Sequence, residues 1–384
     1  MKQQLRVGFF SFQNYLDKNT FSGILYYMHK SLASRDIELI NLGNPKEISN
    51  KKSYWNKLRK PIQLMDSLLG FKYHGQNKQL KRFIVTVQKQ LTETPCDLLF
   101  CPVASGEVSF IETKIPILFF SDATPKLINN EYYKSYENLE EFYLAEKHEI
   151  SALSKSNKVV YSSEWAAKSA INDYQAEPEK IKVIPFGANL DNIPSIDQLF
   201  YKSKASRCRL LFIGKDWQRK GGNIAFNTLK SLLSMGIDAE LVMVGCIPPE
   251  EIKHERLKVI PFLNKNIPEE REELNQLFLQ SHFFIFPTRA DCSPIVICEA
   301  NAFGLPVITT DVGGISTIIK EGKNGYMLPL SASSDQYASV IANKFGDRTV
   351  YEQLVKSSRE QYDQYLNWDK WAEAIHGVMI SMLN

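Results

Sequence analysis

Short apolar runs alternate with longer amphipathic segments along the first half of the chain. Such runs predict β-strands, and apolar positions three or four residues apart predict helices. The predicted strands are residues 5–12, 37–42, 97–103, 115–122, 158–163 and 181–187, and the predicted helices are 23–35, 78–93 and 163–174. This strand–helix–strand rhythm indicates a parallel sheet with helices on both faces.

The rhythm lapses around residues 187–206 and then restarts. Further strands are predicted at 208–214, 239–245, 257–263 and 281–287, and further helices at 223–236, 296–304, 315–322 and 335–345. The amphipathic segment 367–383 has no strand after it, so we expect it to cover another surface. We therefore predict two α/β domains, with boundaries 1–190 and 207–365, a linker at 191–206, and residues 366–384 packing back on the first domain.

Composition agrees with two packed domains. The chain has 384 residues, and domains usually have about 100–200. Hydrophobic content is 44%, charged content is 23%, and the net charge of +3 indicates no special partner. An apolar run of about 18 residues, as a membrane span needs, is missing. The six cysteines are scattered without a C-x-x-C pair, which disfavours disulfides and zinc. We predict a soluble protein of the reduced cytoplasm.

A basic, glycine-rich stretch at 212–222, FIGKDWQRKGG, follows a predicted strand. Ligands of open α/β sheets bind beyond the carboxyl ends of the strands. Gly214 permits a tight turn, and Gly221 and Gly222 open a helix whose free N–H groups favour an anion. The cations of the stretch are Lys215, Arg219 and Lys220. It therefore suits a diphosphate, and a solvated basic loop is the alternative.

Two acids follow another strand at a spacing of eight positions. Asp291 and Glu299 are succeeded by a Gly-x-Pro at 304–306 and by the pair Gly313–Gly314. Carboxylates accept hydrogen bonds from hydroxyls, which a sugar nucleotide carries at both ends of its diphosphate. We expect Glu299 to bind the ribose and Asp291 the transferred sugar. The backbone between them would wrap the sugar and phosphate, through Ser293, Pro294, Ile295 and Val296. For either acid taken alone, a solvated charge is the more common explanation, and the combination with the glycines and the basic loop favours a site.

In combination, these stretches resemble the retaining glycosyltransferases of family four, which have the GT-B fold of two facing Rossmann-like domains. The family's acid-x7-acid motif is matched by Asp291, Glu299, Gly304, Pro306 and Val307, and its glycine-and-basic loop by Gly214, Lys220 and Gly221. Residues 181–191 resemble the interdomain hinge. The glycine pair near the N-terminus is matched by Ser22 and Gly23.

The chain departs from the family pattern at three positions. Asp291 replaces the more usual Glu and shortens the reach to the donor sugar. Lys215 replaces the usual Arg, for which Arg219 compensates in part. Where the first domain often carries a His, the sequence offers Asp122. Two roles remain open for Asp122, orienting the sugar or acceptor and capping a turn.

The resemblance implies transfer of a hexose from a nucleotide-diphosphate sugar to a hydroxyl acceptor, with retention. Asp291, Lys220 and Asp122 are the candidate catalytic residues, and Phe262 and Leu263 are expected beside the base. UDP-glucose or a similar UDP-hexose is favoured and GDP-mannose is second. The resemblance implies no metal, and no cofactor besides the donor substrate. The alternatives are a non-catalytic sugar-nucleotide-binding GT-B protein and a GT-B epimerase. No G-x-G-x-x-G follows the first strand, which disfavours a dehydrogenase.

Residues 51–90 form a strongly basic segment. It contains ten Lys or Arg and one acid, Asp66, with apolar residues interleaved. A basic amphipathic stretch can lie on anionic lipid, which would place the protein at the inner face of a membrane. It can equally hold an acidic acceptor or form a solvated face. Nucleic acid is not expected, because no nucleic-acid motif accompanies the charge.

Overall fold

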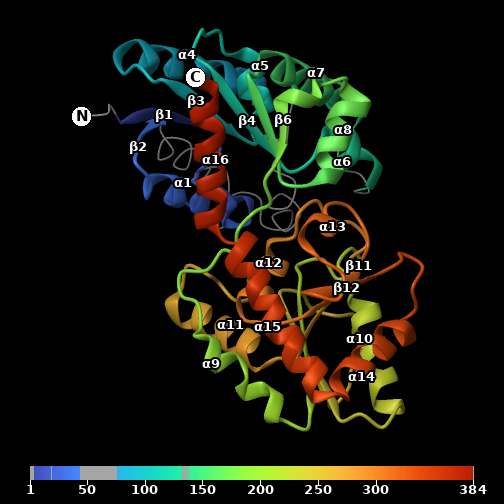
Figure 1. The fold of residues 1–384 in the computed structure, drawn as a ribbon. Coiled ribbons are helices and arrows are strands. Elements are labelled where there is room, and N and C mark those ends of the chain that lie inside the picture. The colour runs from blue at the N-terminus through green and yellow to red at the C-terminus, as the bar shows by residue number, and fades with distance from the viewer. Residues whose placement is uncertain (1–3, 19, 44–75, 132–135, 137, 384) are drawn as a thin grey trace. The chain divides into compact units, whose positions relative to one another are not determined.

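The computed structural model describes residues 4–18, 20–43, 76–131, 136 and 138–383 (Figure 1). The chain divides into two compact units. The first is Met1–Ile184 with Trp371–Asn384, and the second is Pro185–Lys370. Half of the segment expected to link two domains, 191–206, is helical, as α9 (Ile196–Leu199) and η3 (Tyr201–Lys204), and the segment belongs to the second unit.

The first unit is built on a six-stranded parallel sheet with the order β2-β1-β3-β4-β5-β6. Its strands are β1 (Leu5–Phe10), β2 (Ile37–Leu42), β3 (Leu98–Pro102), β4 (Ile117–Ser121), β5 (Lys158–Tyr161) and β6 (Ile181–Val183). Its helices are η1 (Thr20–Gly23), α1 (Ile24–Ala33), α4 (Gln76–Glu93), α5 (Ser105–Phe110), α6 (Pro125–Glu131), α7 (Leu139–Lys155), α8 (Glu164–Tyr174) and η2 (Pro178–Lys180). The central strands β3 and β4 are buried along their whole length, as continuous apolar runs in a covered parallel sheet should be.

The last helix, α16 (Trp368–Leu383), completes the core of the first unit (Figure 1). The Trp371 ring lies edge-on to Phe100 and Phe120, at centroid distances of 5.9 and 5.8 Å. Ile375 and Met379 follow at intervals of four residues and are fully buried. This spacing puts all three on one face of the helix, and that face packs on the sheet.

The second unit repeats the plan with a parallel sheet of order β12-β11-β10-β7-β8-β9. Its strands are β7 (Cys208–Ile213), β8 (Ala239–Val244), β9 (Leu257–Ile260), β10 (Phe283–Phe286), β11 (Val307–Thr310) and β12 (Gly325–Leu328). Besides α9 and η3, its helices are α10 (Gly222–Ser234), α11 (Pro268–Gln280), α12 (Ile295–Ala302), α13 (Ile315–Ile318), α14 (Ser334–Phe345) and α15 (Arg348–Tyr365). The strand order reverses between β7 and β10, and such a switch point is where ligands of open sheets bind.

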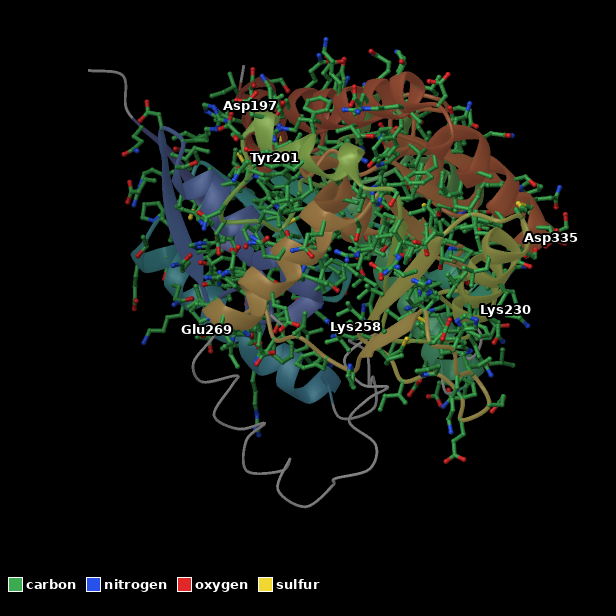
Figure 2. All side chains as sticks on the ribbon, turned by 90° about the horizontal axis from the view of Figure 1, so that it is seen from below. Asp197, Tyr201, Lys230, Lys258, Glu269 and Asp335 are labelled. Atoms are coloured by element: carbon green, nitrogen blue, oxygen red, sulfur yellow. The ribbon has the colours of Figure 1, made fainter. Side chains whose placement is uncertain are left out.

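Charged side chains of the second unit stand on its outer surface. Figure 2 labels Lys230, Lys258, Glu269 and Asp335, all of which are exposed. They come from α10, β9, α11 and α14. Two parallel sheets, each packed against helices, confirm the predicted α/β class.

Candidate nucleotide-sugar site

The loops that follow β7 and β10 are held together at the switch point of the second sheet. The carbonyl of Arg219 accepts hydrogen bonds from the Arg289 N–H at 2.7 Å and from the Thr288 hydroxyl at 3.1 Å. The Arg219 guanidinium donates to the carbonyl of Ala290 at 3.0 Å. The basic loop predicted to hold a diphosphate is therefore fixed by the loop that leads to Asp291.

Two glycines make these contacts possible. Gly221 has a φ of +77°, and a Cβ there would lie 2.0 Å from the carbonyl oxygen of Pro287. Gly313 has a φ of +55°, and a Cβ there would lie 1.8 Å from the carbonyl oxygen of Asp291. A side chain at either position would collide with backbone. Gly313 therefore lets its backbone pass close to the backbone of the first acid, Asp291.

Lys220 and Asp291 form an ion pair across the switch point. Their side chains are 14% and 11% exposed, so both charges are largely withdrawn from water. The Lys220 ammonium also lies over the ring of Phe286, 4.9 Å from its centroid. Burial lowers the pKa of Lys220, the charge of Asp291 opposes this shift, and Arg219 adds to it. The cation predicted for phosphate and the acid predicted for sugar thus come together in one place.

Glu299 also has a lysine partner, Lys265, which we did not predict. The Lys265 Nζ lies 2.5 Å from the Glu299 Oε1, and the two side chains are 31% and 2% exposed. Glu299 lies in the second turn of α12. Burial raises the pKa of Glu299, and Lys265 lowers it. Lys265 follows the predicted strand 257–263, so its place beyond a carboxyl end was the available signal.

The other residues predicted to bind the donor in the second unit lie within a few positions of these paired residues in the sequence. Lys215 follows β7, and its pKa is lowered first by partial desolvation of the ammonium and then by the charge of Lys265. Phe262, just after β9, is 55% exposed, and Leu263 is half-buried. Ser293, Pro294 and Ile295 are buried, and Val296 is half-buried, at the start of α12.

The candidates of the first unit lie at the carboxyl side of its own sheet. Ser22 has a φ of 54°, between Phe21 at 48° and Gly23 at 83°, and this left-handed run opens α1. Such strain in residues other than glycine is concentrated at functional sites. Asp122 directly follows β4 and is half-buried.

Sequence reasoning missed a buried acid at the switch point of the first sheet, between β1 and β3. Glu107, in α5, accepts a hydrogen bond from the Phe12 N–H at 2.9 Å. Burial raises the pKa of Glu107 to about 7. The carboxyl group thereby anchors the loop that leaves β1. No motif marked it, because an acid in a short helix is usually solvated.

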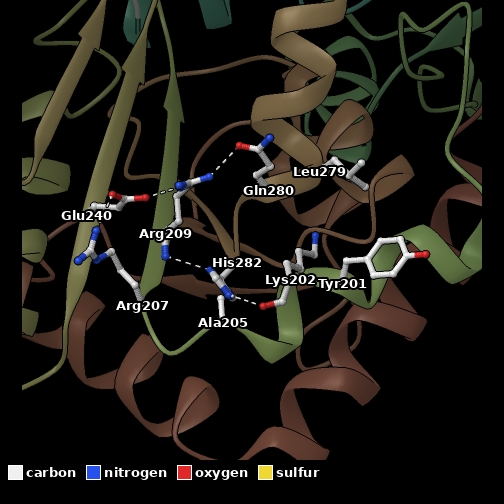
Figure 3. A pocket seen from close by; sticks show the side chains of 9 residues that line it. All are labelled: Tyr201, Lys202, Ala205, Arg207, Arg209, Glu240, Leu279, Gln280 and His282. Carbon is white, nitrogen blue, oxygen red and sulfur yellow. Dashed lines mark hydrogen bonds and ion pairs between the residues drawn. The ribbon is translucent and has the colours of Figure 1, made fainter.

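A cavity of about 460 Å³ lies at the opposite, amino-terminal edge of the second sheet (Figure 3). Arg209 donates to Glu240 and to the Gln280 side chain, the latter at 2.8 Å. His282 accepts from the Arg209 N–H at 3.0 Å and bonds the Lys202 carbonyl at 2.8 Å. All nine lining residues in Figure 3 lie outside the set predicted to bind the donor. Several of its polar groups bond one another, and it lies apart from the candidate site.

Much of the basic segment falls outside the described residues, because 44–75 are not among them. On α4, Lys81, Arg82 and Lys89 are exposed, and the Lys81 ammonium lies 5.6 Å from the ring centroid of Phe110. Lipid docking stays a prediction. Within the described ranges we find neither a helix long and apolar enough to cross a membrane nor a metal-binding group of three His, Cys, Asp or Glu.

A protein-family model matches most of the second unit. The model described as Glycosyl transferases group 1 matches residues 207–346. The chain is 27% identical over 244 residues to D-inositol 3-phosphate glycosyltransferase of Jonesia denitrificans, covering 58% of this chain and 57% of that protein. It is 25% identical over 235 residues to the lipopolysaccharide glucosyltransferase WaaG of Escherichia coli, covering 58% and 63%. The matches thus span less than two thirds of either relative.

Solved structures agree with the fold over nearly the whole chain. The crystal structure of WaaG has a TM-score of 0.61 at 18% identity, covering 97% of this chain and all of that one. Anabaena Alr3699/HepE in complex with UDP has a TM-score of 0.67 at 15% identity, covering 99% and 100%. The GT-B fold that the resemblance implied is confirmed. The chain therefore carries a glycosyl transferases group 1 domain on the GT-B fold of glycosyltransferases.

Proposed function

We propose that the protein transfers a hexose from a nucleotide-diphosphate sugar to a hydroxyl acceptor, with retention at the anomeric carbon. The observation that carries the proposal is the Lys220–Asp291 pair, nearly buried at the switch point of the second sheet. A cation for a diphosphate and an acceptor for sugar hydroxyls stand there in contact. The family match over 207–346 supports the same class of reaction.

The cations of the basic loop would stabilise the leaving diphosphate. Charge develops on the phosphate as the glycosidic bond breaks, and fixed donors aimed at it are usually the largest catalytic contribution. Lys220 is the central candidate, because its ammonium is held by Asp291 and Phe286. Arg219 and Lys215 would add charge from the same loop. These side chains would stabilise the leaving diphosphate without a metal and without a cofactor besides the donor.

Asp291 would orient the sugar by accepting hydrogen bonds from its hydroxyls. The acceptor hydroxyl would attack from the face that the diphosphate leaves, and the departing phosphate would take the acceptor's proton. No side chain of the protein then acts as a nucleophile. Asp122, beyond β4 of the first unit, is the candidate for orienting sugar or acceptor.

A UDP-hexose is the favoured donor, with GDP-mannose second. HepE, a structural neighbour, has been solved with UDP-glucose and with UDP and glucose. The relative WaaG is named as a glucosyltransferase. Phe262, exposed beyond β9, offers an apolar surface for the base.

Thermal unfolding with UDP, GDP and ADP tests the donor. A nucleotide at about 100 times its Kd adds about 2.7 kcal/mol to the free energy of unfolding. The matching sugar nucleotide is then incubated with the protein in the presence of EDTA, and NMR of the anomeric proton follows hydrolysis or transfer. We expect turnover with retained configuration. Tight nucleotide binding without turnover would instead indicate the non-catalytic protein, and inverted configuration would contradict retention.

A further inference from the structure

Glu299 is a buried acid whose charge depends on one neighbour. Its side chain is 2% exposed and lies in α12 between the buried residues Cys298 and Ala300. An ionised carboxylate is strongly disfavoured in such surroundings unless an opposite charge is near. Lys265 supplies that charge at 2.5 Å.

The loop that carries Lys265 is fixed by the first turns of α11. The Asn264 N–H donates to the Glu270 carboxylate at 2.6 Å, and the Ile267 N–H donates to the Asn264 carbonyl at 2.9 Å. The Arg271 guanidinium donates to the carbonyl of Lys265 itself at 3.1 Å. The backbone of Lys265 is thus held by α11, and its side chain reaches Glu299 of α12.

The remaining charged and titratable groups around Glu299 act at longer range. Lys215, beyond β7, is close enough to Lys265 to feel its charge. On α12, the Cys298 thiol has a raised pKa, first because of its own burial and then because of Glu299. From α15, Arg359 donates to the Ala302 carbonyl at 3.3 Å, and Tyr362 lies near Cys298. Lys265 is the group in direct contact with the Glu299 carboxylate.

We propose that Lys265 is a positioning residue that keeps Glu299 ionised, so that this carboxylate accepts hydrogen bonds from both ribose hydroxyls of the donor nucleotide. The inference rests on the proposed function. A carboxylate has about four acceptor sites on its two oxygens, so it can accept from Lys265 and from two hydroxyls, whereas a carboxylic acid carries a proton that must be donated. Hydrogen bonds to a charged partner are also about twice as strong as neutral ones. Without Lys265, burial would favour the protonated form of Glu299 and weaken ribose recognition.

The experiment compares a ribonucleoside diphosphate with its 2′-deoxy counterpart. The ribonucleotide is whichever of UDP, GDP and ADP binds most tightly. Calorimetry gives its Kd and that of its 2′-deoxy counterpart between pH 6.5 and 9. The ratio of the two Kd values cancels changes in phosphate protonation and in the folded fraction. For the wild type we expect a ribose preference that does not vary with pH.

In Lys265→Met, the ribose preference should fall by roughly tenfold at the pH values where Glu299 is protonated and return as the pH rises. Lys265→Arg should show the wild-type profile, because it keeps the positive charge. Lys258→Met is the control: Lys258 is exposed on β9, and its loss should leave the profile unchanged. Glu299→Gln should give a weak preference at every pH. A purely structural role for Lys265 would weaken both nucleotides equally and leave the ratio flat.

The outcomes separate the two proposals. A wild-type protein that binds none of the three nucleotides would overturn the proposed function, and this inference with it. A wild-type protein that prefers the ribonucleotide, together with a Lys265→Met variant whose preference is equally strong at every pH, would overturn the inference alone. Lys265 is 31% exposed, so its variants should fold, and thermal unfolding checks this.

Discussion

Lys220 and Asp291 are joined in an ion pair although they stand 71 positions apart in the sequence. The pair connects the loops after β7 and β10, and its two side chains are 14% and 11% exposed. Breaking a buried pair leaves one charge uncompensated, whereas removing both charges does not. The pair can therefore be examined for folding and for catalysis separately.

For folding, Lys220→Met should lower the free energy of unfolding by about 3–5 kcal/mol, because Asp291 is left without its partner. Asp291→Asn should lower the free energy of unfolding by a similar amount, because Lys220 is then left without its partner. The double variant should lose less than the sum of the two. Urea unfolding of the four proteins measures the coupling, and strict additivity would mean that the pair is not formed in solution.

For catalysis, Lys220→Ala should reduce transfer by about 10²–10³, the usual cost of removing one stabiliser of developing charge. Turnover is measured well below the melting temperature, so that the variant is folded. Lys230→Ala is the control, since Lys230 is exposed on α10 (Figure 2). If a folded Lys220→Ala protein turned over at a nearly normal rate, the residue would have no part in the mechanism.

The two acids should differ in what they bind. Glu299→Gln should weaken the free nucleoside diphosphate, because this acid is assigned to the ribose. Asp291→Asn should leave that binding nearly intact and reduce transfer, because this acid is assigned to the sugar. Calorimetry with the diphosphate and a turnover assay give the two readouts. Equal weakening of the diphosphate by both changes would refute the assignment.

Glycine substitutions test the close backbone approaches. Gly221→Ala should cost more than about 4 kcal/mol, because a Cβ there would lie 2.0 Å from the carbonyl oxygen of Pro287. Gly236→Ala is the matched control. Its φ is +81° with nothing within 4 Å of the added carbon, so only the left-handed strain of about 1–2 kcal/mol remains. Similar losses for both would show that the carbonyl of Pro287 can move aside.

His282 should make the protein sensitive to acid. Burial lowers the pKa of His282 from 6.5 to about 4, and its two ring nitrogens bond the Arg209 N–H and the Lys202 carbonyl (Figure 3). The unfolded chain binds this proton between pH 6.5 and 4 and the folded protein does not, so stability falls as the pH falls through this window. The loss is about 3 kcal/mol.

Urea unfolding from pH 7 to pH 4 measures this loss, and His282→Gln should show a shallower decline. His376→Gln, on α16, should decline as steeply as the wild type. If the His282 variant declined equally, the ring would be accepting its proton in the folded state.

Much of the fold could be predicted from the sequence, because the buried strands are short apolar runs between turn residues. It did not reveal α7, α11 or α15. The apolar positions of α11 are diluted by Glu269, Glu270, Glu272 and Glu273, and α15 is strongly polar. For helices such as these, burial of a narrow stripe decides the structure, and that stripe depends on the neighbouring elements.

In the candidate site, the sequence located the loops but not the partners of the charges. The motif residues were found because glycines and acids follow strands. That each acid would have a lysine from another strand end depends on strand order, and local patterns do not contain the order β10-β7-β8-β9. Lys265 and Glu299 are 34 positions apart and meet only through this order.

The contribution of α16 to the first unit bears on the order in which the chain folds during synthesis. Residues 185–370 of the second unit are continuous, so that unit can close as soon as they leave the ribosome. The first unit needs Trp371 against Phe100 and Phe120, and this residue is made only after the whole second unit. Until α16 has been synthesised, the face of the N-terminal sheet that it covers stays exposed. A chaperone that shields apolar surfaces would act during that interval.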